Sequence, residues 1–194
     1  MGMFNEPDLI AYADDYMGRL HSTLKAIEPQ SITGMARLIL KAYDDEKQIF
    51  VMGNGGSAAT ASHMVTDLCK GASGGLLKRF KVISLNDNLP SLLAIANDMS
   101  YEDVFVEQLK TFMKPSDLVI GISGSGNSKN VLKAIDYANA HGAITAGWTG
   151  YDGGRLKIMA QHSVHANIAD MQIAEDVHLI VNHLMMKMLC KSLH

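Results

Sequence analysis

Five short, mostly apolar runs alternate with helical patterns along this chain, and no other feature constrains its fold as strongly. The runs cover residues 48–53, 78–85, 117–123, 143–149 and 162–168. Because polar residues do not alternate regularly with apolar ones in them, other elements should cover both faces of each strand. This pattern predicts an α/β fold with a doubly wound, five-stranded parallel sheet and helices on both sides. Five strands suit the flavodoxin-like order 2-1-3-4-5, whose crossovers can all be right-handed.

Apolar residues recur at helical spacing before, between and after these runs. The helical segments cover residues 8–27, 32–43, 57–70, 91–97, 101–113, 128–141, 152–159 and 170–193. A chain of 194 residues is most simply one domain, so we expect a single unit over 1–194 that ends in a long C-terminal helix. The two helices in 1–45 carry more apolar surface than five strands need, which predicts contact with another subunit. Alternatively, these two helices pack on the chain's own sheet. Residues 46–194 should form the core that binds a ligand.

Charge and composition narrow the classes of partner. The formal net charge is -3 and the pI is about 6.2, whereas nucleic-acid-binding proteins usually carry a clustered basic face. No stretch approaches about 18 uncharged apolar residues, and residues 1–10 lack the basic and apolar regions of a signal peptide. Cys69 and Cys190 show no C-x-x-C spacing, which favours free thiols in a reducing cytosol. We therefore expect a cytoplasmic protein that binds neither nucleic acid nor membrane.

Two loops rich in glycine and serine follow the first and third predicted strands. They read "GNGGSAATAS" at 53–62 and "GISGSGNS" at 121–128. In the order 2-1-3-4-5 these strands are neighbours whose following helices go to opposite faces, which opens a crevice at the carboxyl ends of the strands. Both loops should reach that crevice, and each leads into a helix N-terminus that attracts an anion. A single phosphate fits this arrangement, and the residues expected to surround it are Gly55, Gly56, Ser57, Ser123, Gly124, Ser125, Gly126 and Ser128.

Two other interpretations of the loops have to be considered. Gly53, Gly55 and Ala58 match the dinucleotide pattern G-x-G-x-x-A, and Asp87 is available to hold a ribose. Alternatively, both loops are tight turns with serine caps and bind nothing. A dinucleotide leaves the second serine-rich loop without a role, and capping alone does not explain why two such loops converge. The pair of loops therefore favours a phosphorylated small molecule.

Polar groups on two of the predicted helices form a candidate metal site. His63 and Asp67 are four residues apart, so they share one helix face. On the last helix, Glu175 and His183 lie two turns apart and about 80° around the axis. Two imidazoles and two carboxylates are a donor set that Zn²⁺ accepts. His178 is interpreted as a core histidine or as a support for the ligands.

The motifs of this chain resemble those of the sugar isomerase (SIS) fold and, within it, the phosphoheptose isomerases. They are "GNGGSAATASH", "AIAND", "GISGSGNS", "NVLKAI", "DGG" and "EDVHLIVNH", and the similarity covers nearly the whole chain. The resemblance implies conversion of sedoheptulose 7-phosphate to a heptose 7-phosphate by a homotetramer with active sites shared between subunits. It also implies a phosphate held by Ser57, Ser123, Ser125 and Ser128, a sugar site lined by Asn54 and Asp98, and zinc between His63, Asp67, Glu175 and His183.

The chain departs from the family pattern at several of these positions. It has Asp67 where the family usually has glutamate, Glu175 where glutamine is usual, and Gly124 where threonine is usual. Gly71 stands where the family usually has arginine. Asp67 is one methylene shorter than glutamate, and a displacement of about 1 Å in a catalytic group can cost ~100-fold in rate. These departures concern the choice of sugar more than the phosphate loops.

An aldose–ketose exchange moves a proton between two neighbouring carbons through an enediol(ate). We expect Asp67 or His183 to carry this proton, with zinc polarising the sugar oxygens and the serine-rich loops anchoring the phosphate. The alternatives are an isomerase or epimerase of another phosphosugar, and a non-catalytic relative that binds a phosphosugar or a protein. The candidate metal residues favour an enzyme, because binding alone does not require them.

Overall fold

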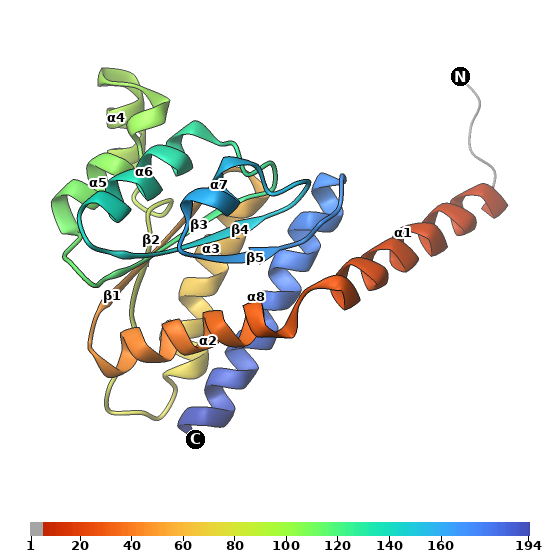
Figure 1. The fold of residues 1–194 in the computed structure, drawn as a ribbon, viewed down its shortest axis with the longest axis horizontal. Helices are drawn as coiled ribbons and strands as arrows, with labels where there is room; N and C mark the ends of the chain where they lie inside the picture. Colours follow the sequence, from red (N-terminus) through yellow and green to blue (C-terminus); the bar gives the residue numbers. More distant parts are fainter. Residues whose placement is uncertain (1–5) are drawn as a thin grey trace.

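The computed structural model describes residues 6–194; residues 1–5, part of the N-terminal segment expected to contact another subunit, lie outside this range (Figure 1). The strands are β1 (Gln48–Gly53), β2 (Lys81–Ser84), β3 (Leu118–Ser123), β4 (Ile144–Thr149) and β5 (His162–His165). The α-helices are α1 (Glu6–Ala26), α2 (Pro29–Asp44), α3 (Gly56–Thr66), α4 (Leu89–Asp98), α5 (Val106–Phe112), α6 (Lys129–Ala140), α7 (Gly154–Met159) and α8 (Met171–Leu193). A π-helix, η1 (Asp67–Ala72), follows α3, and a short 3-10 helix, η2 (Tyr101–Asp103), precedes α5.

The five strands form one parallel sheet in the order β2-β1-β3-β4-β5. The predicted fold class and strand order are therefore confirmed. β1 and β3 are direct neighbours, with Gly53 at the end of β1 paired with Ile122 of β3. The predicted strands 117–123 and 143–149 are one residue too long, and 78–85 and 162–168 are several residues too long, because only 81–84 and 162–165 pair within the sheet.

Alternate residues of the strands point into two separate layers of helices. Ile49 and Val51 of β1 pack with α2, α3 and α8 on one face, whereas Phe50 and Met52 pack with α5, α6 and α7 on the other. All four side chains are fully buried, which explains why the runs contain no regular polar alternation. Figure 1 shows α5, α6 and α7 on one side of the strands and α2 and α8 on the other. As a result, α3 leaves β1 on one face and α6 leaves β3 on the other.

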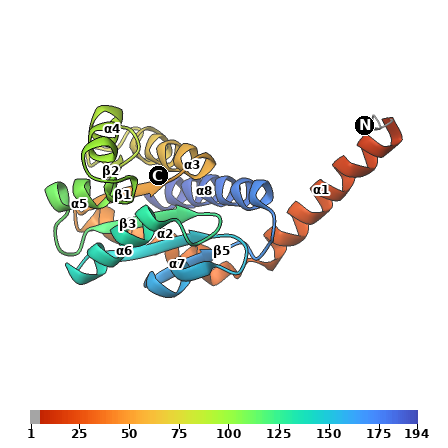
Figure 2. The ribbon, with the colours of Figure 1, turned by 90° about the horizontal axis from the view of Figure 1, so that it is seen from above.

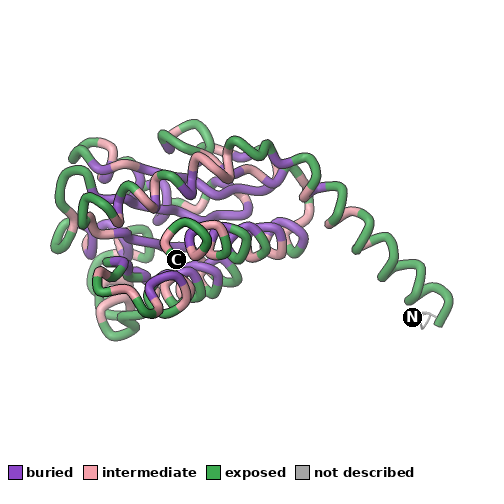
Figure 3. Tube along the Cα trace, turned by 90° about the horizontal axis from the view of Figure 1, so that it is seen from below, coloured by how far each residue is buried: buried purple, intermediate pink, exposed green. Residues whose placement is uncertain are grey.

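Helix α1 extends away from the body of the molecule (Figures 1 and 2). The hydroxyl of Tyr16 in α1 donates to Asp176 of α8 at 2.6 Å, and Arg19 pairs at 2.8 Å with Asp170, the N-cap residue that precedes α8. The hydrogen bond to Asp176 raises the pKa of Tyr16 to about 12. In Figure 3 most of α1 is coloured as exposed. Four of its large apolar residues, Leu9, Ile10, Tyr12 and Met17, are each more than half exposed, whereas Tyr16, Leu20 and Leu24 pack partly against the core.

Helix α2 differs from α1 because it packs on the chain's own sheet, with Met35 and Ile39 buried against the strands. The predicted contact of 1–45 with another subunit thus concerns mainly α1, and it remains a prediction. No helix within residues 6–194 is both long and apolar enough to cross a lipid bilayer.

Candidate active site

The two loops rich in glycine and serine lie side by side at the carboxyl ends of β1 and β3. The side-chain amides of Asn54, in the first loop, and Asn130, in the first turn of α6, exchange two hydrogen bonds of 2.9 Å. The hydroxyl of Tyr101 also donates to Asn54 Oδ1, at 2.8 Å. Asn54 is therefore held by residues from α6 and η2. Neither Asn130 nor Tyr101 was singled out from the sequence, where no local pattern links either residue to Asn54.

The second loop gathers three serine hydroxyls at one point. Ser123 Oγ lies 2.9 Å from Ser128 Oγ and 3.5 Å from Ser125 Oγ. The loop closes through a hydrogen bond of 2.9 Å from the backbone N–H of Gly126 to the carbonyl of Ser123. Gly126 has a φ of +65°, which glycine adopts without strain. Three hydroxyls beside the N-terminus of α6 form a set of donors suited to the oxygens of a phosphate.

The first loop leads directly into α3. Gly56 is the first residue of the helix, and Ser57 follows it as a buried residue. The first backbone N–H groups of an α-helix have no partner within the helix. In α3 those of Ala58 and Ala59 donate to the carbonyl of Gly55, which leaves the N–H groups of Gly56 and Ser57 for an anion. Both loops thus supply helix N-termini to neighbouring positions, as the sequence predicted.

Glu175 reaches this loop from the first turns of α8. A Cβ atom built on Gly56 would overlap the Glu175 carboxyl group, so the absence of a side chain at Gly56 makes room for Glu175. Partial burial, and secondarily the charge of Asp176, raise the pKa of the Glu175 carboxyl above its usual value. The structure therefore places Glu175 beside the first loop, at the start of α3.

Three of the four predicted metal ligands come together between α3 and α8. The Nε2 atoms of His63 and His183 are 2.9 Å apart, and Asp67 Oδ2 lies 3.5 Å from the first and 4.0 Å from the second. Their ligand atoms all lie within 4.8 Å of one another, and Glu175 is not part of this group. Of the four residues predicted to bind a metal, His63, Asp67 and His183 therefore form one cluster. Glu175 lies instead beside Gly56 of the first loop.

The cluster fits a zinc ion by its donor chemistry and its spacing. Two ligands of a tetrahedral Zn²⁺, each bound at about 2.0–2.1 Å, lie about 3.3 Å apart. The three observed separations of 2.9, 3.5 and 4.0 Å bracket that value. Two imidazole nitrogens and one carboxylate oxygen are also donors that zinc accepts.

Asp67 stands where the α-helix changes into the π-helix η1. The sequence predicts one uninterrupted helix over 57–70, whereas the structure shows α3 ending at Thr66 and η1 beginning at Asp67. The wider π-turn changes the direction of the side chains that follow, and such turns are frequent at functional sites. The carboxylate of Asp67 also accepts a hydrogen bond of 2.7 Å from Asn182, a contact that the helical spacing did not predict.

Three other residues considered in the sequence analysis have different surroundings. Asp98 ends α4, is exposed, and accepts a hydrogen bond from Asn97 at 2.8 Å; within residues 6–194 no hydrogen bond joins it to either loop. Gly124 accepts a hydrogen bond from the N–H of Gly150, and a Cβ atom there would overlap Met171 Sδ. His178 is fully buried, and its Nε2 lies 3.2 Å from the carbonyl of Thr149, so it is a core residue, as interpreted from the sequence.

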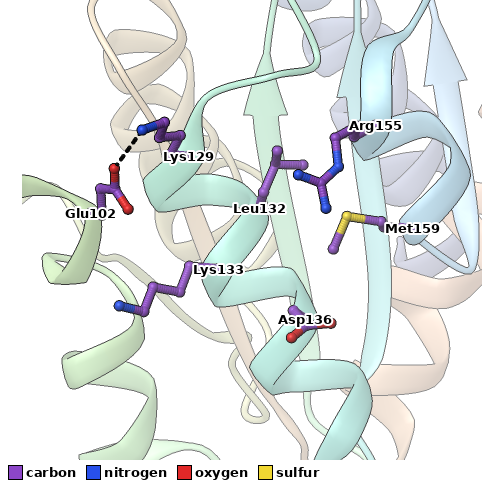
Figure 4. A pocket seen from close by; sticks show the side chains of 7 residues that line it. All are labelled: Glu102, Lys129, Leu132, Lys133, Asp136, Arg155 and Met159. Carbon is purple, nitrogen blue, oxygen red and sulfur yellow. Dashed lines mark hydrogen bonds and ion pairs between the residues drawn. The ribbon is translucent and has the colours of Figure 1, made fainter.

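A separate cavity of about 390 Å³ lies between η2, α6 and α7 (Figure 4). In Figure 4 Lys129 pairs with Glu102, at 2.9 Å, and Arg155 points toward Leu132 and Met159. None of the residues predicted from the sequence to bind substrate or metal lines this cavity. The predicted site residues therefore lie outside this cavity.

The comparisons with known proteins agree with this arrangement. The model of the SIS domain family matches residues 11–150. A probable phosphoheptose isomerase of Thermoplasma acidophilum is 39% identical over 163 residues, which cover 82% of this chain and 87% of the relative. The phosphoheptose isomerase of Chlorobium phaeobacteroides is 36% identical over 172 residues, 87% of this chain and 75% of the relative. The structure of a phosphoheptose isomerase from Neisseria gonorrhoeae has the same fold, with a TM-score of 0.86, 24% identity, and coverage of 96% of this chain and 98% of that one.

The parallel sheet, the paired loops and the matching family model define an SIS-domain protein. Within that class, identity above 30% over most of the chain shows that it belongs to the phosphoheptose isomerase family. The protein is thus an enzyme, an isomerase of the intramolecular oxidoreductase class, and the resemblance of its motifs is confirmed.

Proposed function

We propose that this isomerase acts on a phosphorylated sugar and converts sedoheptulose 7-phosphate into a heptose 7-phosphate. The observation that carries the proposal is the meeting of the two loops, joined by the amide pair of Asn54 and Asn130. The relatives named phosphoheptose isomerases support the choice of substrate. The metal cluster on α3, η1 and α8 belongs to the same layer of helices as the first loop.

The phosphate group would be bound at the crevice. Its oxygens accept hydrogen bonds from the hydroxyls of Ser57, Ser123, Ser125 and Ser128 and from the N–H groups at the start of α3. Binding a remote charged group in this way orients the sugar without taking part in the reaction. Asn54, already fixed by two residues, would then contact the sugar hydroxyls nearer to the phosphate, together with the backbone N–H of Gly56 and the carboxyl group of Glu175. Asp98 would contact the hydroxyls at the far end of the sugar.

The proton transfer is assigned to Asp67 and His183. A base removes the proton from the carbon next to the carbonyl group and returns it to the former carbonyl carbon, while a second proton passes between the two oxygens. Asp67 is only partly exposed, with 14% of its side chain accessible, and His183 lies 4.0 Å away as a second proton carrier. Zinc held by His63, Asp67 and His183 would supply a Lewis acid that polarises the sugar oxygens.

Assembly and location form part of the same proposal. The exposed apolar side chains of α1, among them Leu9 and Met17, are proposed to pack against further copies of the chain in a tetramer that shares its active sites. The free cysteines Cys69 and Cys190 are consistent with a cytoplasmic enzyme. Light scattering with purified protein tests the oligomer; Met17→Glu should lower the measured mass.

A panel of ketose phosphates with six and seven carbons tests the activity. We expect turnover of sedoheptulose 7-phosphate, loss of at least about 100-fold in kcat for Asp67→Asn, and a raised KM with nearly unchanged kcat for Ser125→Ala. Turnover of a different member of the panel would replace the substrate but keep the mechanism. If the purified protein bound phosphosugars without isomerising any of them, the proposal would be wrong and a binding role would take its place.

A further inference from the structure

The nearest neighbour of the Asp67 carboxylate is an amide on α8. Asn182 Nδ2 donates to Asp67 Oδ2 at 2.7 Å, although the two residues are 115 positions apart in the chain. Asn182 is only 2% exposed, whereas the side chains of His63 and His183 are 44% and 48% exposed. The carboxylate is therefore held from the buried side, and the histidines approach it from the solvent side.

All of these contacts meet on the same oxygen atom. The distances to Asp67 Oδ2 are 2.7 Å from Asn182 Nδ2, 3.5 Å from His63 Nε2 and 4.0 Å from His183 Nε2. Asn182 and His183 are consecutive on α8, so their side chains leave the helix about 100° apart. Two neighbouring residues of α8 thus approach the carboxylate from two directions: the amide of Asn182 on one side and the imidazole of His183 on the other.

An amide suits this position for chemical reasons. It donates a hydrogen bond to a carboxylate but does not itself gain or lose a proton, so it cannot compete in the transfer. The terminal torsion of an aspartate is broad, and without a fixed donor the plane of the carboxylate is poorly defined. A partly buried hydrogen bond of 2.7 Å to a charged acceptor therefore restricts the orientation of Oδ2.

We infer that Asn182 is a positioning residue for the reaction, whose amide keeps Asp67 Oδ2 aimed at the two imidazoles. The inference rests on the proposed function, in which Asp67 serves the proton transfer and the metal. It assigns Asn182 no contact with the substrate. Groups that orient a metal ligand in this way commonly change metal affinity or activity by about 10–100-fold when they are removed.

The first experiment replaces Asn182 by leucine, which has a similar size and no donor. We expect kcat to fall about 10–100-fold with KM changed less than about 3-fold, because the phosphate loops are untouched. Zinc affinity of the metal-free chain, measured by competition with a chromophoric chelator, should fall by about the same factor. Met185→Leu is the matched control, since Met185 is buried on the same helix; it should leave both values within about 2-fold. If Asn182→Leu does not fold, Asn182→Ala, which favours the helix, takes its place.

A double-mutant cycle separates positioning from a merely structural role. Asp67→Glu moves the carboxylate by about one carbon–carbon bond, so that it no longer matches the amide. Adding Asn182→Leu to Asp67→Glu should then change kcat and zinc affinity by less than about 3-fold. The inference is wrong if Asn182→Leu lowers kcat and zinc affinity by the same factor in wild type and in Asp67→Glu. It is also wrong if Asn182→Leu alone leaves both values unchanged. If the wild-type chain isomerises no sugar, the proposed function fails, and the zinc titration still decides the role of Asn182.

Discussion

Asn54 and Asn130 face each other across the crevice and each donates its amide N–H to the carbonyl oxygen of the other, at 2.9 Å. The pair joins the loop after β1 to the first turn of α6, elements that lie on opposite faces of the sheet. Asn130 Oδ1 also accepts from the backbone N–H of Val131. The pair therefore links the first loop directly to the helix that follows the second loop.

Replacing Asn130 by leucine should lower the free energy of unfolding by about 1–3 kcal/mol, because the half-buried amide of Asn54 loses its partner. Asn130 is itself 3% exposed, so water cannot readily replace it. Unfolding in urea, followed by circular dichroism, measures the change. Tyr101→Phe is the control: it removes a single hydroxyl from the same oxygen of Asn54, at an exposed site, and should cost less than about 1 kcal/mol. A larger loss for Tyr101→Phe than for Asn130→Leu would contradict this account of the pair.

Gly126→Ala should destabilise the protein by at least about 2 kcal/mol. Its φ of +65° disfavours a side chain, and a Cβ atom there would overlap the backbone carbonyl of Gly153, which cannot rotate away. Gly34→Ala, in the interior of α2, is the matched control with nothing within 4 Å of the new methyl group. It should raise stability by about 0.5–1 kcal/mol. Thermal unfolding of both variants decides the matter, and shifts of the same sign would refute the prediction.

The architecture could be predicted from the sequence because it follows from local patterns. The five apolar runs and the helices between them are each visible within a few residues, and the rules for crossovers leave few strand orders to consider. The ends of β2 and β5 were less predictable, because a strand ends where its neighbour stops pairing. The π-helix at Asp67 was missed for a related reason. It packs against α8, and helical periodicity contains no information about that contact.

The site could be predicted only in part. The serine-rich loops and the pair His63 and Asp67 are local motifs, so their members could be named in advance. The partners that orient them come from far along the chain: Asn130 is 76 residues from Asn54, and Asn182 is 115 residues from Asp67. A single asparagine in a helix carries no signal of such a contact. Glu175 illustrates the opposite error, since helical spacing grouped it with His183, whereas its carboxyl group reaches Gly56.

The purified protein should bind about one zinc ion per chain, and His63→Ala should lower the affinity by more than about 100-fold because one of three clustered donors is lost. Glu175→Gln should change the affinity by less than about 10-fold, since Glu175 lies outside the cluster. Metal analysis together with chelator titration measures both effects. Removal of the metal by dialysis against chelator should also lower turnover reversibly. Equal losses for the two variants would show that Glu175 is a full ligand, contrary to its position beside Gly56.

His178 should make stability depend on pH below neutrality. Burial lowers the pKa of this imidazole to about 4; a hydrogen bond to the Thr149 carbonyl opposes the shift, and the nearby His165 adds to it slightly. An unfolded histidine binds a proton below about pH 6.5. Between that pH and about 4 the unfolded chain therefore holds more protons than the folded one, and the free energy of unfolding falls as pH decreases.

The contribution of His178 to this slope is at most about 1.4 kcal/mol per pH unit. His178→Gln removes the titrating group, so the difference in stability between wild type and variant should shrink as pH falls from 7 to about 4.5. Urea unfolding at a series of pH values measures this difference, with His162→Gln at an exposed position of β5 as the control. If the curves of wild type and His178→Gln run parallel over that range, the protonation of His178 is not coupled to folding. If the stability of His178→Gln approaches that of wild type as pH falls, and the stability of His162→Gln does not, the buried imidazole of His178 between β4 and α8 is the group that weakens the fold in mild acid.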